Sequence, residues 1–181
     1  MNFTLPTLLT LLRIFLLPVI VLLLYLPQAW SGAAAAAVFL LASLTDWLDG
    51  YLARRLGQES RFGAFLDPVA DKLMVATVLA VLVEQQASVW ITLPAVIIIG
   101  REITISALRE WMAQVGQRSK VAVSHIGKIK TTAQLLALLL LIYEQPLLGL
   151  PVFEIGMASL YIAALLTVWS MVSYLKAAFS E

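Results

Sequence analysis

The chain reads DWLDGYLARRLGQESRFGAFLDPVAD from Asp46 to Asp71. This segment holds four aspartates in two pairs, and the spacing within each pair, three or four residues, puts both members on one helical face. The polar residues 55–61 between the pairs predict a tight turn that folds two helices back on each other. In such a hairpin Asp46 faces Asp71 and Asp49 faces Asp67, so all four carboxylates lie at about the same depth.

The rest of the sequence is strongly apolar. Hydrophobic residues make up 61% of the 181 residues and charged residues 13%, against about 45–50% and about 25% in soluble domains. We therefore expect an all-α integral membrane protein that forms a single domain over residues 1–181. The chain has no cysteine, which excludes disulfides and thiolate chemistry.

Six apolar segments are long enough to span a bilayer, which takes about 20 apolar residues. A short segment before them, Met1–Thr7, is expected to lie at the membrane interface. Pro68 follows Asp67 directly, and it either places that aspartate near a helix start or bends the helix. The expected transmembrane helices are Leu8–Leu26, Gly32–Ala53, Gly63–Val83, Val89–Leu108, Ile126–Tyr143 and Val152–Tyr174.

The basic residues indicate the orientation in the membrane. With six spans, all twelve Lys and Arg residues lie near the same face. The turns at the other face, residues 27–31, 84–88 and 144–151, contain none. Because Lys and Arg accumulate on the cytoplasmic side, we expect both termini and the acidic hairpin to face the cytoplasm.

Four carboxylates that face one another inside a membrane protein require cations. A charged side chain at the bilayer centre costs about 2.5–3.5 kcal/mol on insertion scales, and like charges repel. Carboxylate oxygens without nearby His or Cys ligands favour Mg²⁺ or Mn²⁺. Two such ions about 3.5–4 Å apart form a recurring arrangement for phosphoryl transfer. The sequence therefore predicts a site for divalent metal ions at the four aspartates.

Small residues accompany the aspartates. Gly50 and Ala53 continue the helical stripe of the first pair, and Gly63 precedes the second pair by one turn. Such residues would let a phosphate or a nucleotide approach the backbone, and the planar guanidinium of Arg54 suits a diphosphate. The alternative is that the small residues only allow close packing of helices.

The complete pattern is D-x2-D-G-x2-A-R-x8-G-x3-D-x3-D. This is the signature of the CDP-alcohol phosphotransferase family, and the chain resembles that family over most of its length. LPTLLTLLR, DPVADK, GREITISALREW and GKIKTTAQ resemble the bacterial branch whose acceptor is glycerol 3-phosphate. One departure is Pro6-Thr7, where many members have Pro-Asn. The positions that match the signature are Asp46, Asp49, Gly50, Ala53, Arg54, Gly63, Asp67 and Asp71.

The resemblance implies a six-helix enzyme of the bacterial inner membrane, commonly a homodimer and without a nucleic-acid partner. Its donor would be CDP-diacylglycerol and its acceptor glycerol 3-phosphate, with two Mg²⁺ or Mn²⁺ ions as cofactors. Asp71 would complete the second metal site or act as the general base. The other metal ligands would be Asp46, Asp49 and Asp67, and the CDP-diacylglycerol site would include Asp49, Gly50, Ala53, Arg54, Gly63 and Asp67.

A pocket for glycerol 3-phosphate, a small dianion, needs cations besides the metal ions. Arg101 is the most distinctive of them, because apolar turns flank it on both sides. Each candidate has a plainer interpretation as a cytoplasmic-side charge, and Arg101 has a further one as a partner of Glu102 or Glu110. The candidates for binding the acceptor phosphate are Arg13, Arg101, Arg109, Lys128 and Lys130.

Two other functions compete with this interpretation. The same chemistry with serine, inositol phosphate or a phospholipid as acceptor is possible, but GREITISALREW and GKIKTTAQ argue against it. A divalent-cation transporter is the alternative from another class, because carboxylates inside the membrane also mark ion paths. A transporter would need polar residues across the whole membrane, whereas the outer half of every expected span is almost purely apolar.

Overall fold

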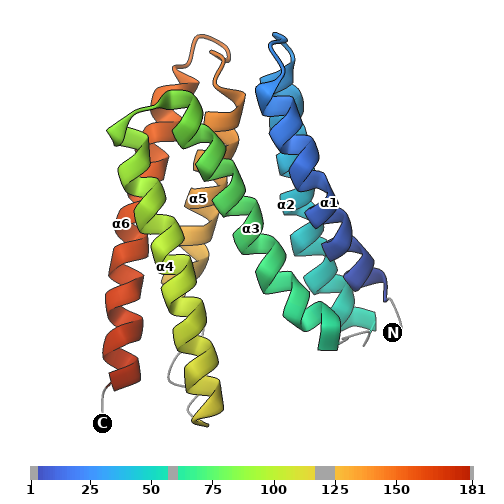
Figure 1. Cartoon of the computed structure of the whole chain (residues 1–181), viewed down its shortest axis with the longest axis vertical. Helices are drawn as coiled ribbons and strands as arrows, with labels where there is room; N and C mark the ends of the chain where they lie inside the picture. The colour runs from blue at the N-terminus through green and yellow to red at the C-terminus, as the bar shows by residue number, and fades with distance from the viewer. Residues whose placement is uncertain (1–3, 57–60, 117–124, 180–181) are drawn as a thin grey trace.

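The computed structural model describes residues 4–56, 61–116 and 125–179, and this part of the chain is helical throughout apart from short connections. The helices run alternately up and down, so α1 begins and α6 ends at the same end of the molecule (Figure 1). The all-α prediction is confirmed. The helices are α1 (Leu5–Tyr25), α2 (Ser31–Leu56), α3 (Arg61–Gln86), α4 (Val89–Gln114), α5 (His125–Tyr143) and α6 (Val152–Phe179).

Length and composition make this an α-helical membrane protein. Within the described residues, three helical segments are long and apolar enough to span a bilayer, namely Thr7–Tyr25, Val89–Gln114 and Val152–Lys176. Two shorter apolar segments are Ser31–Asp46 and Ile129–Tyr143. The charged residues of the signature lie at the end of α2 and at the start of α3, on either side of residues 57–60. For this reason these two helices are not apolar over a full membrane thickness.

Two helices, α1 and α3, begin more than one residue earlier than expected from the sequence. α1 begins at Leu5 with a proline in its first turn, where the fixed φ of proline favours a helix. Residues 5–7 of the expected interfacial segment are therefore part of α1, and residues 1–3 lie outside the described part. α3 begins at Arg61, so Pro68 lies inside the helix. The suggestion that Pro68 puts Asp67 near a helix start is therefore wrong.

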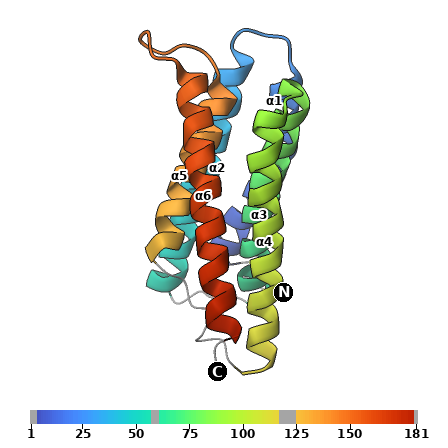
Figure 2. The same ribbon diagram turned by 90° about the vertical axis from the view of Figure 1, so that its left-hand side faces the viewer.

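α1 joins the two helices that carry the aspartates. It packs against both α2 and α3, whereas direct packing between α2 and α3 is slight within the residues that the structure describes. α5 packs against α6 and α2, and α4 packs against α3 and α6. Figures 1 and 2 show the resulting elongated bundle. Within the described residues, the two arms of the predicted hairpin are therefore held together mainly by a third helix, α1.

A continuous apolar core lies beyond the aspartates toward the α1–α2 and α3–α4 connections. On α3 the core begins with Met74 and Val75 and continues through Val78 and Leu79, which are fully buried. Because lipid is as apolar as these side chains, such a core is held together by close van der Waals packing. Its fully buried members from the other helices include Ile20, Phe39, Ile98, Leu138 and Leu160.

Gly156 of α6 lies against the side chains of Leu140 and Leu141 of α5. A Cβ atom at this position would lie 3.0 Å from Leu141 Cγ and 3.1 Å from Leu140 Cβ. Small residues at helix contacts let two backbones approach closely in membranes. The glycine therefore allows α5 and α6 to pack closely at this position, and these two helices carry part of the cluster of charges described below.

Gly156→Val is expected to lower the free energy of unfolding by about 1–3 kcal/mol, because added methyl groups must displace well-packed neighbours. The measurement is the midpoint of thermal unfolding of the detergent-solubilised protein. Gly100→Val is the matched control, since a Cβ at Gly100 of α4 meets no atom within 4 Å. Equal losses in the two variants would show that the α5–α6 contact is not tight at Gly156.

Candidate active site

The carboxylates of Asp46, Asp67 and Asp71 form one group. Asp46 projects from α2 and the other two from α3, and one oxygen of each lies within 4.8 Å of the others. Their side chains are 38%, 41% and 46% exposed, respectively, so ligands can reach them. Oxygen ligands at this spacing, without His or Cys, suit a hard divalent cation such as Mg²⁺ or Mn²⁺. The chemistry of the three residues therefore fits the metal site that the sequence predicts.

The other signature residues are placed less fully. Asp49, Gly50, Ala53 and Arg54 belong to α2, but their side-chain environments lie outside the described residues. Gly63 is half-buried on α3, one turn before Asp67. The predicted roles of these five residues in binding metal or CDP-diacylglycerol remain predictions.

Arg13 lies at the centre of the aspartate group. Its side chain on α1 is 0% exposed, and its Nη1 atom is 2.9 Å from Asp46 Oδ1, 2.5 Å from Asp71 Oδ1 and 3.4 Å from Asp67 Oδ1. The sequence suggested Arg13 only as a contact for the acceptor phosphate, and that role remains a prediction. Its place among the aspartates was not expected, because nothing in helical spacing relates position 13 to positions 46–71.

A second cluster of charges joins α4, α5 and α6. Arg101 Nη1 lies 3.4 Å from Glu102 Oε1, and Lys130 Nζ donates a hydrogen bond to the same oxygen. Arg101 Nη2 also donates to Ser170 Oγ at 3.0 Å. The Arg101 and Lys130 side chains are 8% and 4% exposed. Two predicted acceptor residues are therefore brought together around one carboxylate.

Arg109 extends this cluster toward the end of the bundle where the chain termini lie. Its Nη2 atom donates to the Tyr174 hydroxyl at 2.9 Å. The guanidinium carbons of Arg109 and Arg101 lie 5.1 and 5.5 Å from the centre of the Tyr174 ring, within the range of cation–π attraction. Tyr174 therefore orients both arginines. The side chain of Lys128 lies outside the described residues.

Sequence reasoning missed Ser170 and Tyr174 as partners of the arginines. A signal was present, because these two residues carry hydroxyl groups and lie four apart on one face of a largely apolar helix, α6. Glu102 was considered as one of two possible partners of Arg101, and the structure selects it over Glu110. Lys72, next to Asp71 in sequence, donates from Nζ to the Pro68 carbonyl oxygen at 3.0 Å.

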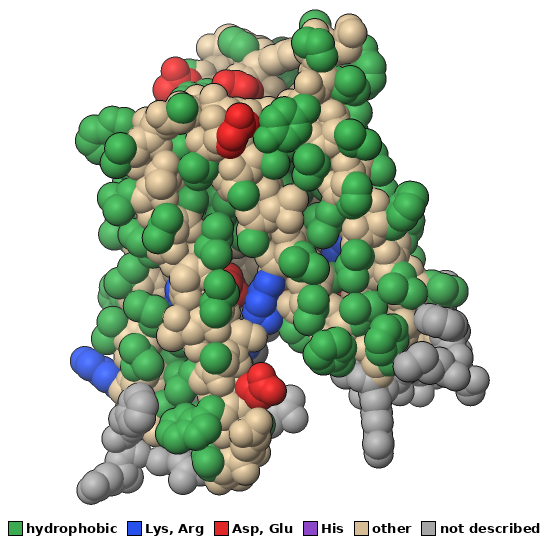
Figure 3. Space-filling view, viewed as in Figure 1, with side chains coloured by type: hydrophobic (Ala, Val, Ile, Leu, Met, Phe, Trp, Pro, Cys, Tyr) green, Lys and Arg blue, Asp and Glu red, His purple; other side chains and the backbone are tan. Residues whose placement is uncertain are grey.

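The two ends of the molecule differ in the charged side chains that they expose. On the face in Figure 3, no Lys or Arg side chain is visible at the upper end, where acidic side chains are seen. The lower part is hollowed between the helices, and basic side chains are visible in the recess. The distribution of charge in space thus follows the asymmetry of the sequence.

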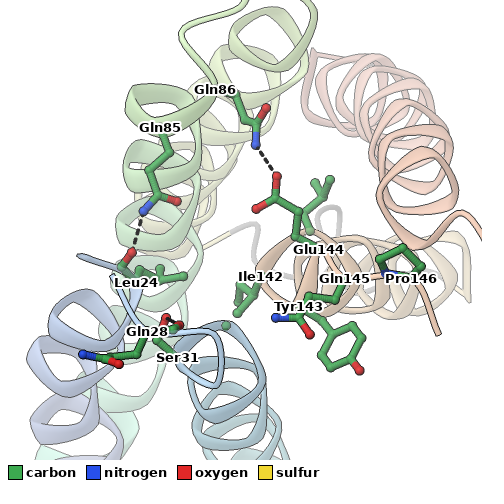
Figure 4. A pocket seen from close by; sticks show the side chains of 12 residues that line it. Leu24, Gln28, Ser31, Gln85, Gln86, Ile142, Tyr143, Glu144, Gln145 and Pro146 are labelled. Atoms are coloured by element: carbon green, nitrogen blue, oxygen red, sulfur yellow. Dashed lines mark hydrogen bonds between the residues drawn. The ribbon is translucent and has the colours of Figure 1, made fainter. Parts of the chain in front are cut away.

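A pocket of about 510 Å³ lies at the upper end, remote from the aspartates along α3. Figure 4 shows its polar lining, in which Gln86 Nε2 donates to Glu144 Oε1 at 2.9 Å and Gln85 Nε2 donates to the Leu24 carbonyl at 2.7 Å. The buried Val78 and Leu79 lie on α3 between this pocket and Asp71. An apolar layer therefore separates the pocket from the acidic group.

Comparison with known proteins identifies the class. The family model described as CDP-alcohol phosphatidyltransferase matches residues 3–169. The chain belongs to this family and is accordingly a phosphatidyltransferase, as the signature in α2 and α3 predicted.

Curated bacterial relatives are similar over almost their whole length. A protein of Pectobacterium atrosepticum is 58% identical over 178 residues, 98% of this chain and 96% of the relative. Proteins of Escherichia coli strain K12 and Shigella flexneri serotype 5b are each 56% identical over the same shares. All three are named CDP-diacylglycerol--glycerol-3-phosphate 3-phosphatidyltransferase.

Proposed function

We propose that the chain transfers the phosphatidyl group of CDP-diacylglycerol to glycerol 3-phosphate, giving phosphatidylglycerophosphate and CMP. The observation that carries the proposal is the cluster of the three carboxylates of Asp46, Asp67 and Asp71, all of which belong to the signature of the family. The names of relatives that are 56–58% identical support this donor and this acceptor.

Two Mg²⁺ or Mn²⁺ ions are the proposed cofactors. Asp46, Asp49, Asp67 and Asp71 would hold them, and the spacing of the three described carboxylates supports this. When bound, the ions would neutralise the diphosphate of the donor and stabilise the departing CMP.

The residues of the chain would position the reactants and accept a proton. The acceptor hydroxyl attacks the lipid-bearing phosphorus, the bond from this phosphorus to the CMP oxygen breaks, and the hydroxyl proton passes to a base. Asp71 is the proposed base, or a ligand of the second ion, because it is the carboxylate least needed to bridge two ions. Positioning of this kind supplies much of the rate in a direct displacement.

The proposed donor site lies along the signature. Arg54 would pair with the diphosphate through its planar guanidinium. Small residues beside the metal ligands would let the nucleotide reach the helix backbone, while the acyl chains stay in the bilayer. The residues proposed to contact CDP-diacylglycerol are Asp49, Gly50, Ala53, Arg54, Gly63 and Asp67.

The basic cluster is the proposed site for glycerol 3-phosphate. Arg101, Arg109 and Lys130 are linked with a single carboxylate, Glu102, through the bonds described above, partly by way of Tyr174. Three cations and one carboxylate leave a formal excess of two positive charges, which matches a dianion. Arg101 Nε and Arg109 Nε are buried without a hydrogen-bond partner among the described residues. An unpaired buried donor costs about 1–3 kcal/mol, so an acceptor phosphate would relieve a real cost.

The proposed topology has six transmembrane helices, with both termini and the active site on the cytoplasmic side of a bacterial inner membrane. The shared end of α1 and α6 and the absence of Lys and Arg from the turns at the other end support it. A homodimer is proposed from the family resemblance. Lys128 and Arg13 remain further candidates for contact with the acceptor.

The test is an assay of the purified protein with CDP-diacylglycerol, Mg²⁺ and a panel of alcohols, in which release of CMP is followed. CMP release is expected with glycerol 3-phosphate, and this release should be lost when EDTA removes the metal. Release with serine in its place would assign a different acceptor. No release with any alcohol would favour a cation transporter, against which the apolar layer between Asp71 and the upper pocket already argues.

A further inference from the structure

The Arg13 guanidinium occupies the position where the three described aspartates converge. Its Nη1 atom contacts the Oδ1 atoms of Asp46, Asp67 and Asp71 at 2.5–3.4 Å. A bound Mg²⁺ would need oxygens at about 2.0–2.1 Å. One nitrogen atom and one metal ion cannot both take the centre of a group whose oxygens lie within 4.8 Å of one another.

The rest of α1 holds Arg13 at this place. Thr10, Leu17 and Ile20 lie on the same helical face as Arg13 and are 2%, 7% and 0% exposed. Leu17 and Ile20 belong to the apolar core, so rotation of α1 away from the aspartates would withdraw them from their packing. Only the flexible end of the Arg13 side chain is therefore able to move without disturbing the helix.

The three aspartate carboxylates need a positive counter-charge when no metal ion is bound to them. Three carboxylates of a membrane protein that converge without a counter-charge would repel one another, and α2 and α3 pack directly against each other only slightly in the described part. Arg13 on α1 links both helices through its ion pairs. With Arg13 the described group still has a formal charge of minus two, from three carboxylates and one guanidinium, and so continues to attract a divalent cation.

We propose that Arg13 is the internal counter-ion of the aspartate group and that divalent metal must displace its guanidinium to bind. Arg13 then has two effects: it stabilises the metal-free protein by joining α1, α2 and α3, and it weakens the affinity for metal. The inference rests on the proposed metal site and goes beyond it. It assigns to Arg13, a residue of α1 outside the signature, control over how tightly the site binds divalent metal.

The test is titration of the full-length protein in detergent with Mn²⁺ alone, without substrates, followed by electron paramagnetic resonance. Arg13→Gln is expected to bind Mn²⁺ roughly 10- to 100-fold more tightly than the wild type, the range in which groups next to metal ligands alter affinity. In EDTA the same variant is expected to unfold at a lower temperature than the wild type, and saturating Mn²⁺ is expected to remove this difference. Lys176→Gln, which loses an exposed positive charge at the end of α6, is the matched control and should change neither value.

Equal or weaker binding of Mn²⁺ by Arg13→Gln would overturn the proposal, and so would an unchanged unfolding temperature in EDTA. If Arg13→Gln folds only with Mn²⁺ present, the counter-ion role is supported. If it does not fold at all, Arg13→Lys decides, since the shorter lysine keeps the charge but brings its ammonium less close to the three carboxylates than Nη1 of Arg13, so metal displaces it more easily. Tighter binding by this variant supports the proposal, and wild-type affinity overturns it. A wild-type protein that binds no Mn²⁺ would instead remove the metal site itself.

Discussion

Asp67→Asn is expected to lower the rate of CMP release by at least roughly 10²–10³-fold, the loss seen when one group that stabilises charge in a transition state is removed. The asparagine keeps the size of the side chain but removes a charge from the group that Asp67 forms with Asp46 and Asp71. A hard cation bound there loses an anionic oxygen ligand. The measurement is the initial rate of CMP release at saturating Mg²⁺ and saturating substrates.

Glu84→Gln is the matched control, because it makes the same chemical change on the same helix. Glu84 lies near the far end of α3, where its Oε2 accepts a hydrogen bond from the Tyr25 hydroxyl at 3.1 Å, and this variant should keep wild-type turnover. An Asp67→Asn protein as active as this control would show that the aspartate group is not the metal site. Asp71→Asn separates two roles when its CMP release and its Mn²⁺ binding are both measured, since a base can be removed without loss of Mn²⁺ binding and a ligand cannot.

The convergence of the aspartates could be predicted because it depends on local spacing. Residues three or four apart share a helical face, and a short turn brings two such faces together at one depth. Asp46, Asp67 and Asp71 do lie together at one site. The participation of Arg13 could not be predicted, since periodicity says which side of α1 is polar but not which helices that side will contact.

The packing of α1 against both arms of the hairpin is a long-range property. It depends on how the apolar faces of all six helices fit together. The same reasoning applies to the basic cluster, where Glu102 and Glu110 were equally plausible partners of Arg101 in sequence. The chosen pairing depends on Lys130, which α5 brings to the same oxygen, and on Ser170 of α6. Such contacts between distant segments arise only when the helices pack.

Lys130→Gln is expected to raise the KM for glycerol 3-phosphate by about 10- to 100-fold and to leave the KM for CDP-diacylglycerol nearly unchanged. A hydrogen bond between a charged donor and an anion is worth about 1.5–3 kcal/mol, and 1.4 kcal/mol corresponds to a factor of ten. Glu102 keeps Arg101 as a partner in this variant, so the substitution does not leave the carboxylate without a cation. Steady-state kinetics with each substrate varied in turn measure both constants.

The alternative role for a buried lysine is to hold α4 and α5 together, so the assay must separate phosphate recognition from a structural effect. Glycerol, which lacks the phosphate, provides this separation as a second acceptor. If Lys130 binds the phosphate, the ratio of kcat/KM for glycerol 3-phosphate to kcat/KM for glycerol falls, because only one acceptor loses a contact. Equal losses for the two acceptors would give Lys130 a structural role alone. Lys176→Gln should leave this ratio of kcat/KM values unchanged. Lys176 is exposed on the last turn of α6 and, among the described contacts, makes none with Arg101, Glu102 or Lys130.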